Sequence, residues 1–267
     1  MVRQGYKDFY ELQADEYSPE DGRINYRHDQ FFNVRNLIQK SYGEKCTILD
    51  VGCGNGYQTA PFTGKNKVFG LDISEANIEK ATAKGIIAQL HDIEEPIPFK
   101  DATFDVVVCS EVLEHLFFPE EVIKECYRVL KKSGLFIVTI PNLYCLRNRI
   151  SMLMGRNCNF VEYPINREHI RFFSLYGMMD ILKETGFKIQ HFRGQEFAMN
   201  FSWPYKVIWY LHGGNKGLRI LIRIATLGRI RAELPGPILQ FYIYRFLGWF
   251  LTRLSPGLVF ACRKCEI

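Results

Sequence analysis

The sequence lacks any run of apolar residues long enough to cross a membrane. None of its uninterrupted apolar stretches reaches about 18 residues, the length that a spanning helix needs. The opening MVRQGYKDFYELQADEY has no apolar core of the kind found in a secretory signal. The eight cysteines also lack the short, regular spacing of a disulfide framework. These absences predict a cytoplasmic protein with reduced thiols.

Internal repeats, low-complexity tracts and recognised nucleic-acid-binding motifs are absent as well, which makes nucleic acid the less favoured partner. The charge is unevenly distributed. Residues 200–267 hold ten Lys and Arg against two acids, a net charge of +8, whereas residues 1–199 sum to −3. A basic, aromatic-rich segment on a mildly acidic body favours contact with something anionic.

Between residues 46 and 194, β-like apolar runs alternate with helical patterns, which predicts a parallel sheet with crossover helices. The predicted strands are 46–51, 67–72, 86–92, 104–110, 134–140 and 187–192, with 258–264 completing the sheet. The predicted helices are 28–41, 74–85, 119–134 and 174–186, with Ser74, Pro119 and Ser174 at their starts and Gly85, Gly134 and Gly186 at their ends. We therefore expect a helical entry at 1–45, a core at 46–194, a basic aromatic cap at 195–257 and a final strand with the C-terminus at 258–267.

The segment Asp50–Gly56, DVGCGNG, leaves the first predicted strand and turns at once into a helix. Its three alternate glycines permit a tight turn and let a ligand press against the backbone, but alone they would also suit a dinucleotide. The neighbouring acids narrow the choice. Asp50 would repel a pyrophosphate and suits a ligand with an ammonium group and a sulfonium. Asp72, at the end of the second strand, suits ribose hydroxyls, and Asp92, after the third, suits an adenine amino group.

These residues resemble the class I S-adenosylmethionine-dependent methyltransferases, of the type 11 and type 12 kind, whose first motif reads D-x-G-C-G-x-G. The resemblance covers residues 46–194 and the run 258–264. It implies an α/β fold with a Rossmann-like seven-stranded sheet, its last strand antiparallel, helices on both faces and a helical cap. It also implies S-adenosylmethionine as cofactor and S-adenosylhomocysteine as product. The implied cofactor-binding residues are Asp50, Gly52, Cys53, Gly54, Gly56, Asp72, Ile73, Asp92, Ile93 and Ser110.

The fragment Glu111–His115, EVLEH, follows the fourth predicted strand, beside the expected methyl group. In one interpretation Glu111, Glu114, His115 and His169 bind a divalent metal, as the resemblance to small-RNA 2′-O-methyltransferases and ubiquinone-pathway O-methyltransferases implies. In the other, the fragment is a common helix entry, and His115 is a base or merely covers the cofactor. The predicted catalytic residues are His115, Glu111 and His169.

Three functions remain open. The first is O-methylation of a small hydroxylated acceptor, lipid-linked or sugar-containing. The second is metal-dependent 2′-O-methylation of RNA. The third is a non-catalytic partner, since the span PNLYCLRNRISMLMGR resembles the methionine-biosynthesis-associated methyltransferase-like proteins. The amphipathic stretches 216–231 and 238–254 favour either peripheral contact with an anionic membrane, through 200–257, or packing over the active site.

Overall fold

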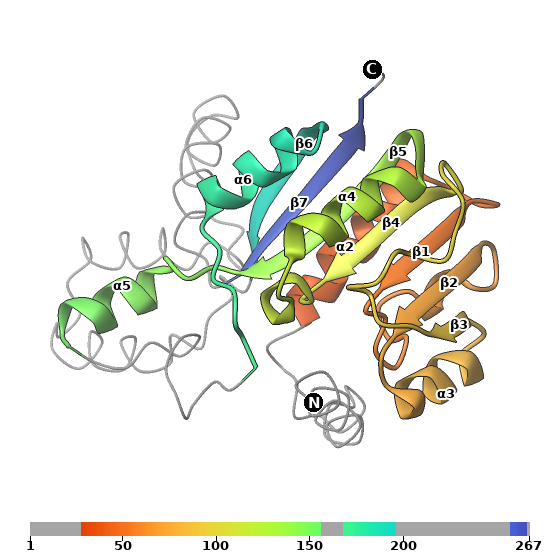
Figure 1. Cartoon of the computed structure of the whole chain (residues 1–267), viewed down its shortest axis with the longest axis horizontal. Coiled ribbons are helices and arrows are strands. Elements are labelled where there is room, and N and C mark those ends of the chain that lie inside the picture. The colour runs from red at the N-terminus through yellow and green to blue at the C-terminus, as the bar shows by residue number, and fades with distance from the viewer. Residues whose placement is uncertain (1–27, 156–167, 196–256, 266–267) are drawn as a thin grey trace, which may run out of the picture.

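The computed structural model describes residues 28–155, 168–195 and 257–265, and it contains one seven-stranded sheet in the order β3-β2-β1-β4-β5-β7-β6 (Figure 1). The strands are β1 Thr47–Val51, β2 Lys67–Asp72, β3 Ile87–Leu90, β4 Phe104–Ser110, β5 Leu130–Pro141, β6 Phe187–Gln195 and β7 Gly257–Lys264. Pairing is parallel from β3 through β5, and β7 runs antiparallel to both β5 and β6. The predicted fold class, including the antiparallel last strand, is confirmed.

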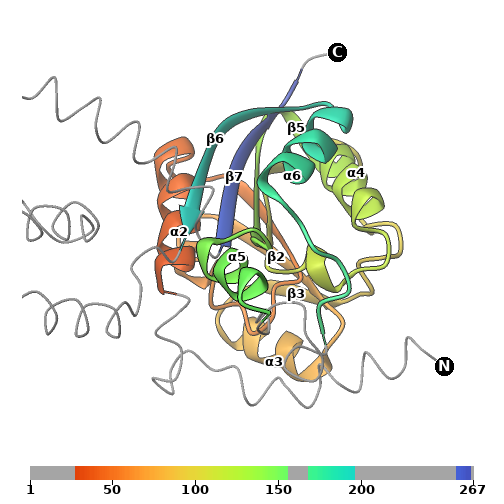
Figure 2. The ribbon, with the colours of Figure 1, turned by 90° about the vertical axis from the view of Figure 1, so that its left-hand side faces the viewer.

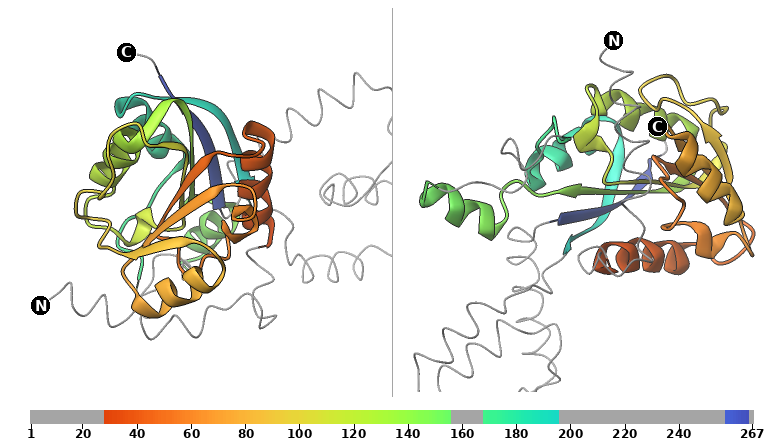
Figure 3. Two further views of the ribbon diagram at one scale, coloured as in Figure 1. Left: turned by 90° about the vertical axis from the view of Figure 1, so that its right-hand side faces the viewer. Right: turned by 90° about the horizontal axis from the view of Figure 1, so that it is seen from below.

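Two hydrophobic layers cover the two faces of the sheet, because side chains of successive strand residues point to opposite sides. Helices α4, Pro119–Val129, and α6, Leu175–Glu184, pack on one face; α2, His28–Ser41, and α3, Glu75–Ala83, pack on the other (Figure 3). In β4, for instance, Val107 contributes to the first layer, while Val106 and Val108 contribute to the second. The central strands are therefore buried on both sides, and their ends alone are left to bind ligands.

Helix starts agree with the sequence better than helix ends do. Ser74 and Ser174 cap α3 and α6, each accepting a hydrogen bond from a backbone N–H three residues later. The predicted helix 119–134 is wrong over its last five residues, because α4 ends at Val129 and β5 begins at Leu130. Gly134 therefore does not end a helix. It lies within β5, where a β-carbon would stand 2.7 Å from the Leu130 side chain.

One further helix, α5 at Leu146–Leu153, was not predicted, and it projects beyond the carboxyl end of β5 (Figures 1 and 2). Two short 3₁₀ turns, η2 at Ala60–Phe62 and η3 at Leu113–His115, complete the elements that the site uses. All of the predicted cap at 195–257 except its end residues Gln195 and Gly257, which belong to β6 and β7, lies outside the described residues, as does most of the predicted entry at 1–45. Within the residues that are described, no helix is long and apolar enough to cross a membrane.

Candidate active site

The glycine turn after β1 is tied to the end of β2. Gly52 and Cys53 both donate their N–H groups to the Leu71 carbonyl, at 2.8 and 2.9 Å. Gly54 N–H donates to Asp72 Oδ2 at 2.7 Å, and Ser74 N–H donates to Oδ1 of the same carboxylate at 3.0 Å. Asp72 is buried, so these bonds fix its orientation at the edge where the two strands end. The structure thus brings the predicted glycines and the predicted ribose-binding acid into direct contact.

The three glycines of the turn meet different demands. All have positive φ angles, of 70°, 51° and 77°, a conformation that favours glycine. A β-carbon on Gly52 would stand 2.5 Å from the Val112 side chain, and one on Gly56 would stand 2.5 Å from Ile86. A β-carbon on Gly54 would meet nothing within 4 Å. Gly52 and Gly56 therefore serve packing, whereas Gly54 borders open space that a ligand can enter, as a bound cofactor requires.

Asp50 lies beneath the turn and is buried. Its Oδ2 accepts a hydrogen bond from Thr59 Oγ1 at 2.7 Å. Burial raises the pKa of Asp50 to about 7, the Thr59 bond opposes that shift, and nearby Asp72 adds to it. Burial also raises the pKa of the Cys53 thiol well above its usual value, and Asp50 and Asp72 reinforce the effect. Cys53 is accordingly a neutral thiol, and Gly70 of β2 leaves room for it, since a β-carbon there would stand 2.7 Å from its sulfur.

The other predicted cofactor residues line the same edge. Ile73 directly follows Asp72. Asp92 and Ile93 are the second and third residues after Leu90, the last residue of β3. Asp92 Oδ1 accepts a hydrogen bond from Glu94 N–H at 3.0 Å, which stabilises the turn after β3. Ile93 packs against the hydrophobic core. Ser110 ends β4, where its hydroxyl contacts Thr139 Oγ1 at 2.9 Å. Their contact with the cofactor stays a prediction.

Glu111 comes next and has an unusual backbone. Its φ angle of 56° is rare for a residue with a side chain and costs about 1–2 kcal/mol. Two hydrogen bonds to Thr139 of β5 hold it there: Glu111 N–H donates to the Thr139 carbonyl at 3.1 Å, and Thr139 Oγ1 donates to Glu111 Oε1 at 2.8 Å. The strained residue redirects the chain from β4 into η3.

Glu114, His115 and His169 meet where η3 approaches the segment before α6. Their candidate ligand atoms all lie within 4.8 Å of one another. Glu114 Oε1 is 3.7 Å from His115 Nε2 and 4.0 Å from His169 Nε2, and the two imidazole rings are in edge-to-face contact with centroids 4.8 Å apart. Glu114 is buried and both histidines are mostly so. Glu111, the fourth predicted metal ligand, is not part of this group among the residues that were searched.

Backbone contacts hold the three residues together. His115 Nδ1 lies 3.2 Å from the Glu168 carbonyl, and Ile170 and Arg171 both donate their N–H groups to the Glu114 carbonyl, at 2.8 and 3.0 Å. Metal-binding histidines commonly donate one ring N–H to a carbonyl, which leaves the other nitrogen for the ion. Two ligands of one ion bound at about 2.1 Å lie at most about 4.2 Å apart. The two nitrogen–oxygen distances to Glu114 satisfy this limit, whereas the group as a whole spans up to 4.8 Å, so the two histidines would have to draw together around an ion. In residue type, two imidazoles and a carboxylate suit a divalent cation.

The sequence did not single out Thr59, Thr139 or Glu94. Thr59 lies nine residues beyond Asp50, and Thr139 lies on a different strand from Glu111, so no local spacing signals either contact. Glu94 Oε1 accepts from the N–H groups of Phe117 and Phe118, at 2.6 and 3.0 Å. It thereby links the loop after β3 to the turn that leads into α4.

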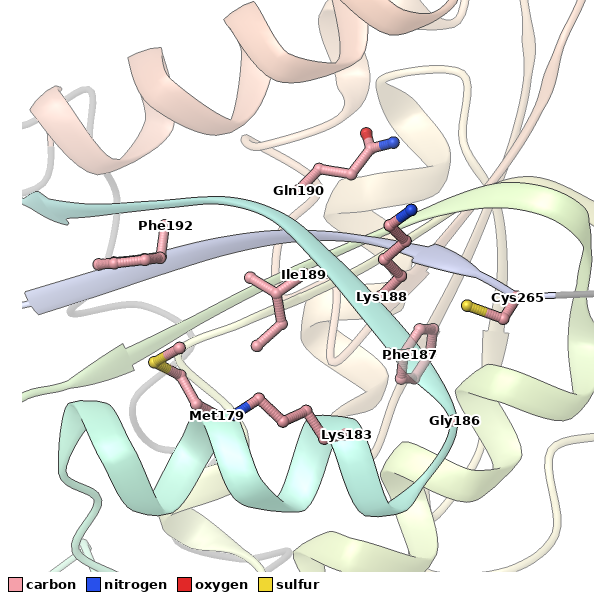
Figure 4. A pocket seen from close by; sticks show the side chains of 9 residues that line it. All are labelled: Met179, Lys183, Gly186, Phe187, Lys188, Ile189, Gln190, Phe192 and Cys265. Carbon is pink, nitrogen blue, oxygen red and sulfur yellow. The ribbon is translucent and has the colours of Figure 1, made fainter.

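A separate groove lies at the opposite end of the sheet, between α6 and the start of the edge strand β6 (Figure 4). Lys183, Phe187, Lys188 and Cys265 are among the residues that line it. None of the predicted site residues borders this groove. The candidate active site is therefore the carboxyl edge of β1, β2 and β4 rather than the groove.

A parallel sheet with an antiparallel seventh strand, a glycine turn after β1 and an acid at the end of β2 is the arrangement of the Rossmann-like methyltransferase fold. A family model described as a methyltransferase domain matches residues 49–138. A solved structure from Thermotoga maritima, described as an S-adenosylmethionine-dependent methyltransferase and possible histamine N-methyltransferase, has a TM-score of 0.59 at 21% identity and aligns over 96% of this chain and 98% of that one. This likeness concerns the fold alone.

Two curated relatives carry the comparison further. A probable S-adenosylmethionine-dependent methyltransferase of Mycolicibacterium smegmatis is 29% identical over 60% of this chain and 60% of that protein. A ubiquinone biosynthesis O-methyltransferase of Rickettsia typhi is 28% identical over 66% of this chain and 74% of the relative. The chain spans 55–60% of the length of the mycobacterial relatives that it matches. Over its core the chain is similar to class I S-adenosylmethionine-dependent methyltransferases, and the methyltransferase-domain match at residues 49–138 supports that superfamily and S-adenosylmethionine as cofactor.

Proposed function

We propose that this protein transfers the methyl group of S-adenosylmethionine to a hydroxyl oxygen of a small, lipid-linked or sugar-containing acceptor, which a divalent cation at Glu114, His115 and His169 helps to hold. The observation that carries the proposal is this two-histidine, one-carboxylate group, whose first two residues follow Val112, the residue packed against Gly52 of the glycine turn. Similarity to ubiquinone biosynthesis O-methyltransferases supports an oxygen acceptor.

The protein's own residues divide the work. Gly54 and Asp72 receive the cofactor, which supplies a methyl group on a sulfonium that is already a good leaving group. The remaining tasks are to align the acceptor oxygen with that methyl and to remove its proton. Glu114, His115 and His169 would hold a cation that orients vicinal acceptor oxygens and makes the hydroxyl more acidic. The backbone bonds to Glu114 and His115 keep these side chains at the edge while the acceptor enters.

Cation binding can be tested without knowing the acceptor. Two imidazoles and a carboxylate suit Mn²⁺ or Zn²⁺ better than Mg²⁺, which prefers oxygen ligands. We expect the purified protein to bind Mn²⁺ in calorimetry, and we expect Glu114→Gln and His169→Ala to weaken that binding on the order of tenfold or more. His191→Ala is the matched control, because His191 is exposed on β6 and far from the group in sequence and topology. Unchanged Mn²⁺ binding in Glu114→Gln would overturn the cation site.

The reaction is tested by supplying methyl-labelled cofactor to extracts with and without the protein and searching for labelled metabolites and lipids. A labelled methyl ether supports the proposal. A labelled amine or carbon would move the activity to another acceptor class, and an absence of label together with intact cofactor binding would favour a non-catalytic partner. Full activity in chelator would leave His115 as a base that acts without a cation.

A further inference from the structure

Helix α5 exposes an apolar tip on a fixed base. Leu153 is 91% exposed, and Ile150 and Met154 are 46% and 55% exposed. These residues stand three and four positions apart, so they share one face of the helix. Exposed apolar side chains that occur singly are ordinary, whereas a contiguous group on a projecting helix marks a contact surface. Figure 1 shows α5 standing clear of the helices that cover the sheet.

Hydrogen bonds and burial fix the N-terminal end of α5 to the rest of the protein, so the exposed end keeps a defined position. Cys145, before the first turn, is buried, and buried Asn148 donates through Nδ2 to the Leu143 carbonyl at 2.9 Å. Arg149 Nε donates to the Tyr144 carbonyl at 2.7 Å. Leu143 N–H in turn donates to the Phe173 carbonyl at 3.2 Å. The helix is therefore anchored to the same segment, 168–173, that brings His169 to Glu114.

The described segment that carries α5 contains no acid. From residue 142 to 155 the sequence has Arg147 and Arg149 and no acidic residue. Arg149 is exposed on the helix, and Tyr144, at the base, is also exposed. Arginine and tyrosine beside an apolar helix face are the composition of helices that lie in the plane of a membrane surface, where apolar side chains enter the acyl boundary and cations face anionic headgroups. At eight residues α5 is too short to cross a bilayer.

We propose that the tip of α5, Ile150, Leu153 and Met154 with Arg149 at its rim, docks on an anionic lipid surface. This contact would place the Glu114–His169 edge beside the headgroups, where a lipid-linked acceptor presents its hydroxyl. The docking surface is inferred only from the exposed residues of α5. The proposal that the acceptor is lipid-linked rests on the proposed function.

The test measures sedimentation of the full chain with vesicles of phosphatidylglycerol and phosphatidylcholine in equal parts, and with vesicles of phosphatidylcholine alone. The wild type should bind the anionic vesicles more tightly, and added salt should weaken the binding, because exposed charges are screened within about 8 Å at physiological ionic strength. Leu153→Asp should lower the partition coefficient on the order of tenfold, because it removes one buried aliphatic side chain from the contact. Ile87→Asp is the matched control: Ile87 is 55% exposed on the distant edge strand β3 and should leave binding within about twofold.

The charge is tested by Arg149→Gln, which should weaken binding to anionic vesicles only, while Arg149→Lys should restore it. Wild type that ignores anionic vesicles at low salt, or Leu153→Asp that binds them like the wild type, overturns the proposal. Self-association that Leu153→Asp abolishes would also overturn it, in favour of a second copy as the occupant. Cofactor affinity and methyl transfer are measured on the same variants. Vesicle binding without methyl transfer would sink the proposed function alone, and methyl transfer without vesicle binding would sink this inference alone.

Discussion

The cofactor half and the acceptor half of the carboxyl edge are built in different ways. In the cofactor half, the glycine turn and Asp72 join two neighbouring parallel strands, and backbone N–H groups make most of the contacts. In the acceptor half, Glu114 and His115 depend on a segment more than 50 residues away, and strained Glu111 depends on another strand. The similar proteins from Mycolicibacterium smegmatis and Thermotoga maritima are both described as S-adenosylmethionine-dependent, whereas the names of the similar proteins point to different acceptors. The structure of the cofactor half is therefore set by a short sequence motif, whereas the structure of the acceptor half depends on contacts between segments that are far apart in the sequence.

The largest effects should come from the glycines, which separate packing from binding within one turn. Gly56→Val should destabilise the fold by about 2–4 kcal/mol, since it combines a left-handed backbone with a clash against Ile86. Gly54→Ala should cost only about 1–2 kcal/mol, because its β-carbon meets open space, yet it should abolish cofactor binding. Denaturant unfolding and calorimetry with S-adenosylmethionine distinguish the two. Wild-type affinity in Gly54→Ala would show that the cofactor does not occupy that space.

Asp72 should affect both the cofactor and the turn. Asp72→Asn keeps the shape of the side chain, but its single amide oxygen cannot accept from both Gly54 and Ser74 N–H, so one charged hydrogen bond of about 1.5–3 kcal/mol is lost and affinity should fall on the order of tenfold to a hundredfold. Asp180→Asn on α6 provides the control, because Asp180 is an exposed carboxylate whose ion pair is a weak surface contact. Titration calorimetry is the measurement. Equal affinities in the two variants would remove Asp72 from the ribose site.

Asp50 should make the stability of the cofactor half depend on pH. Its folded pKa of about 7 lies above the unfolded value near 3.8, so between these values the folded protein keeps a proton that the unfolded chain releases. This contribution to stability is present below pH 4 and is lost as the pH rises toward 7, by at most about 1.4 kcal/mol per pH unit. Asp50→Asn should lack the slope, so its unfolding free energy relative to wild type should increase across this window. Parallel stability curves for the two proteins would contradict the assigned pKa.

The two halves also differ in how far the sequence predicted them. The strands follow from local apolar runs, and the glycine turn and the acid at the end of β2 follow from a short motif. The antiparallel direction of β7 was expected only from the resemblance to the methyltransferase superfamily, because no local pattern sets the direction of a strand. Helix α5 was missed because its apolar residues face outward, so no core-facing periodicity marks it. The end of α4 was misplaced because Gly134 suits a close strand contact as well as a helix stop. The contact of Glu111 with Thr139 is invisible in the sequence, because it joins two strands past their ends.

The smallest effect concerns Glu111, which the sequence placed among the metal ligands and which the structure places against Thr139. We expect Glu111→Gln to change Mn²⁺ affinity by less than about threefold, because an amide oxygen still accepts the Thr139 hydroxyl and the three-residue group is intact. Glu114→Gln, which keeps the same shape at the neighbouring acid, should lose that affinity.

A double-mutant cycle sharpens the comparison. Glu111→Ala and Thr139→Val should each cost about 1 kcal/mol of stability, and together they should cost less than their sum, because both remove one shared hydrogen bond. Chemical denaturation of the two single variants and the double variant measures the coupling. If Glu111→Gln loses Mn²⁺ as completely as Glu114→Gln does, Glu111 is a fourth ligand that turns toward the cation when it binds. The four metal ligands predicted from the sequence would then be correct, although Glu111 is hydrogen-bonded to Thr139 in the structure.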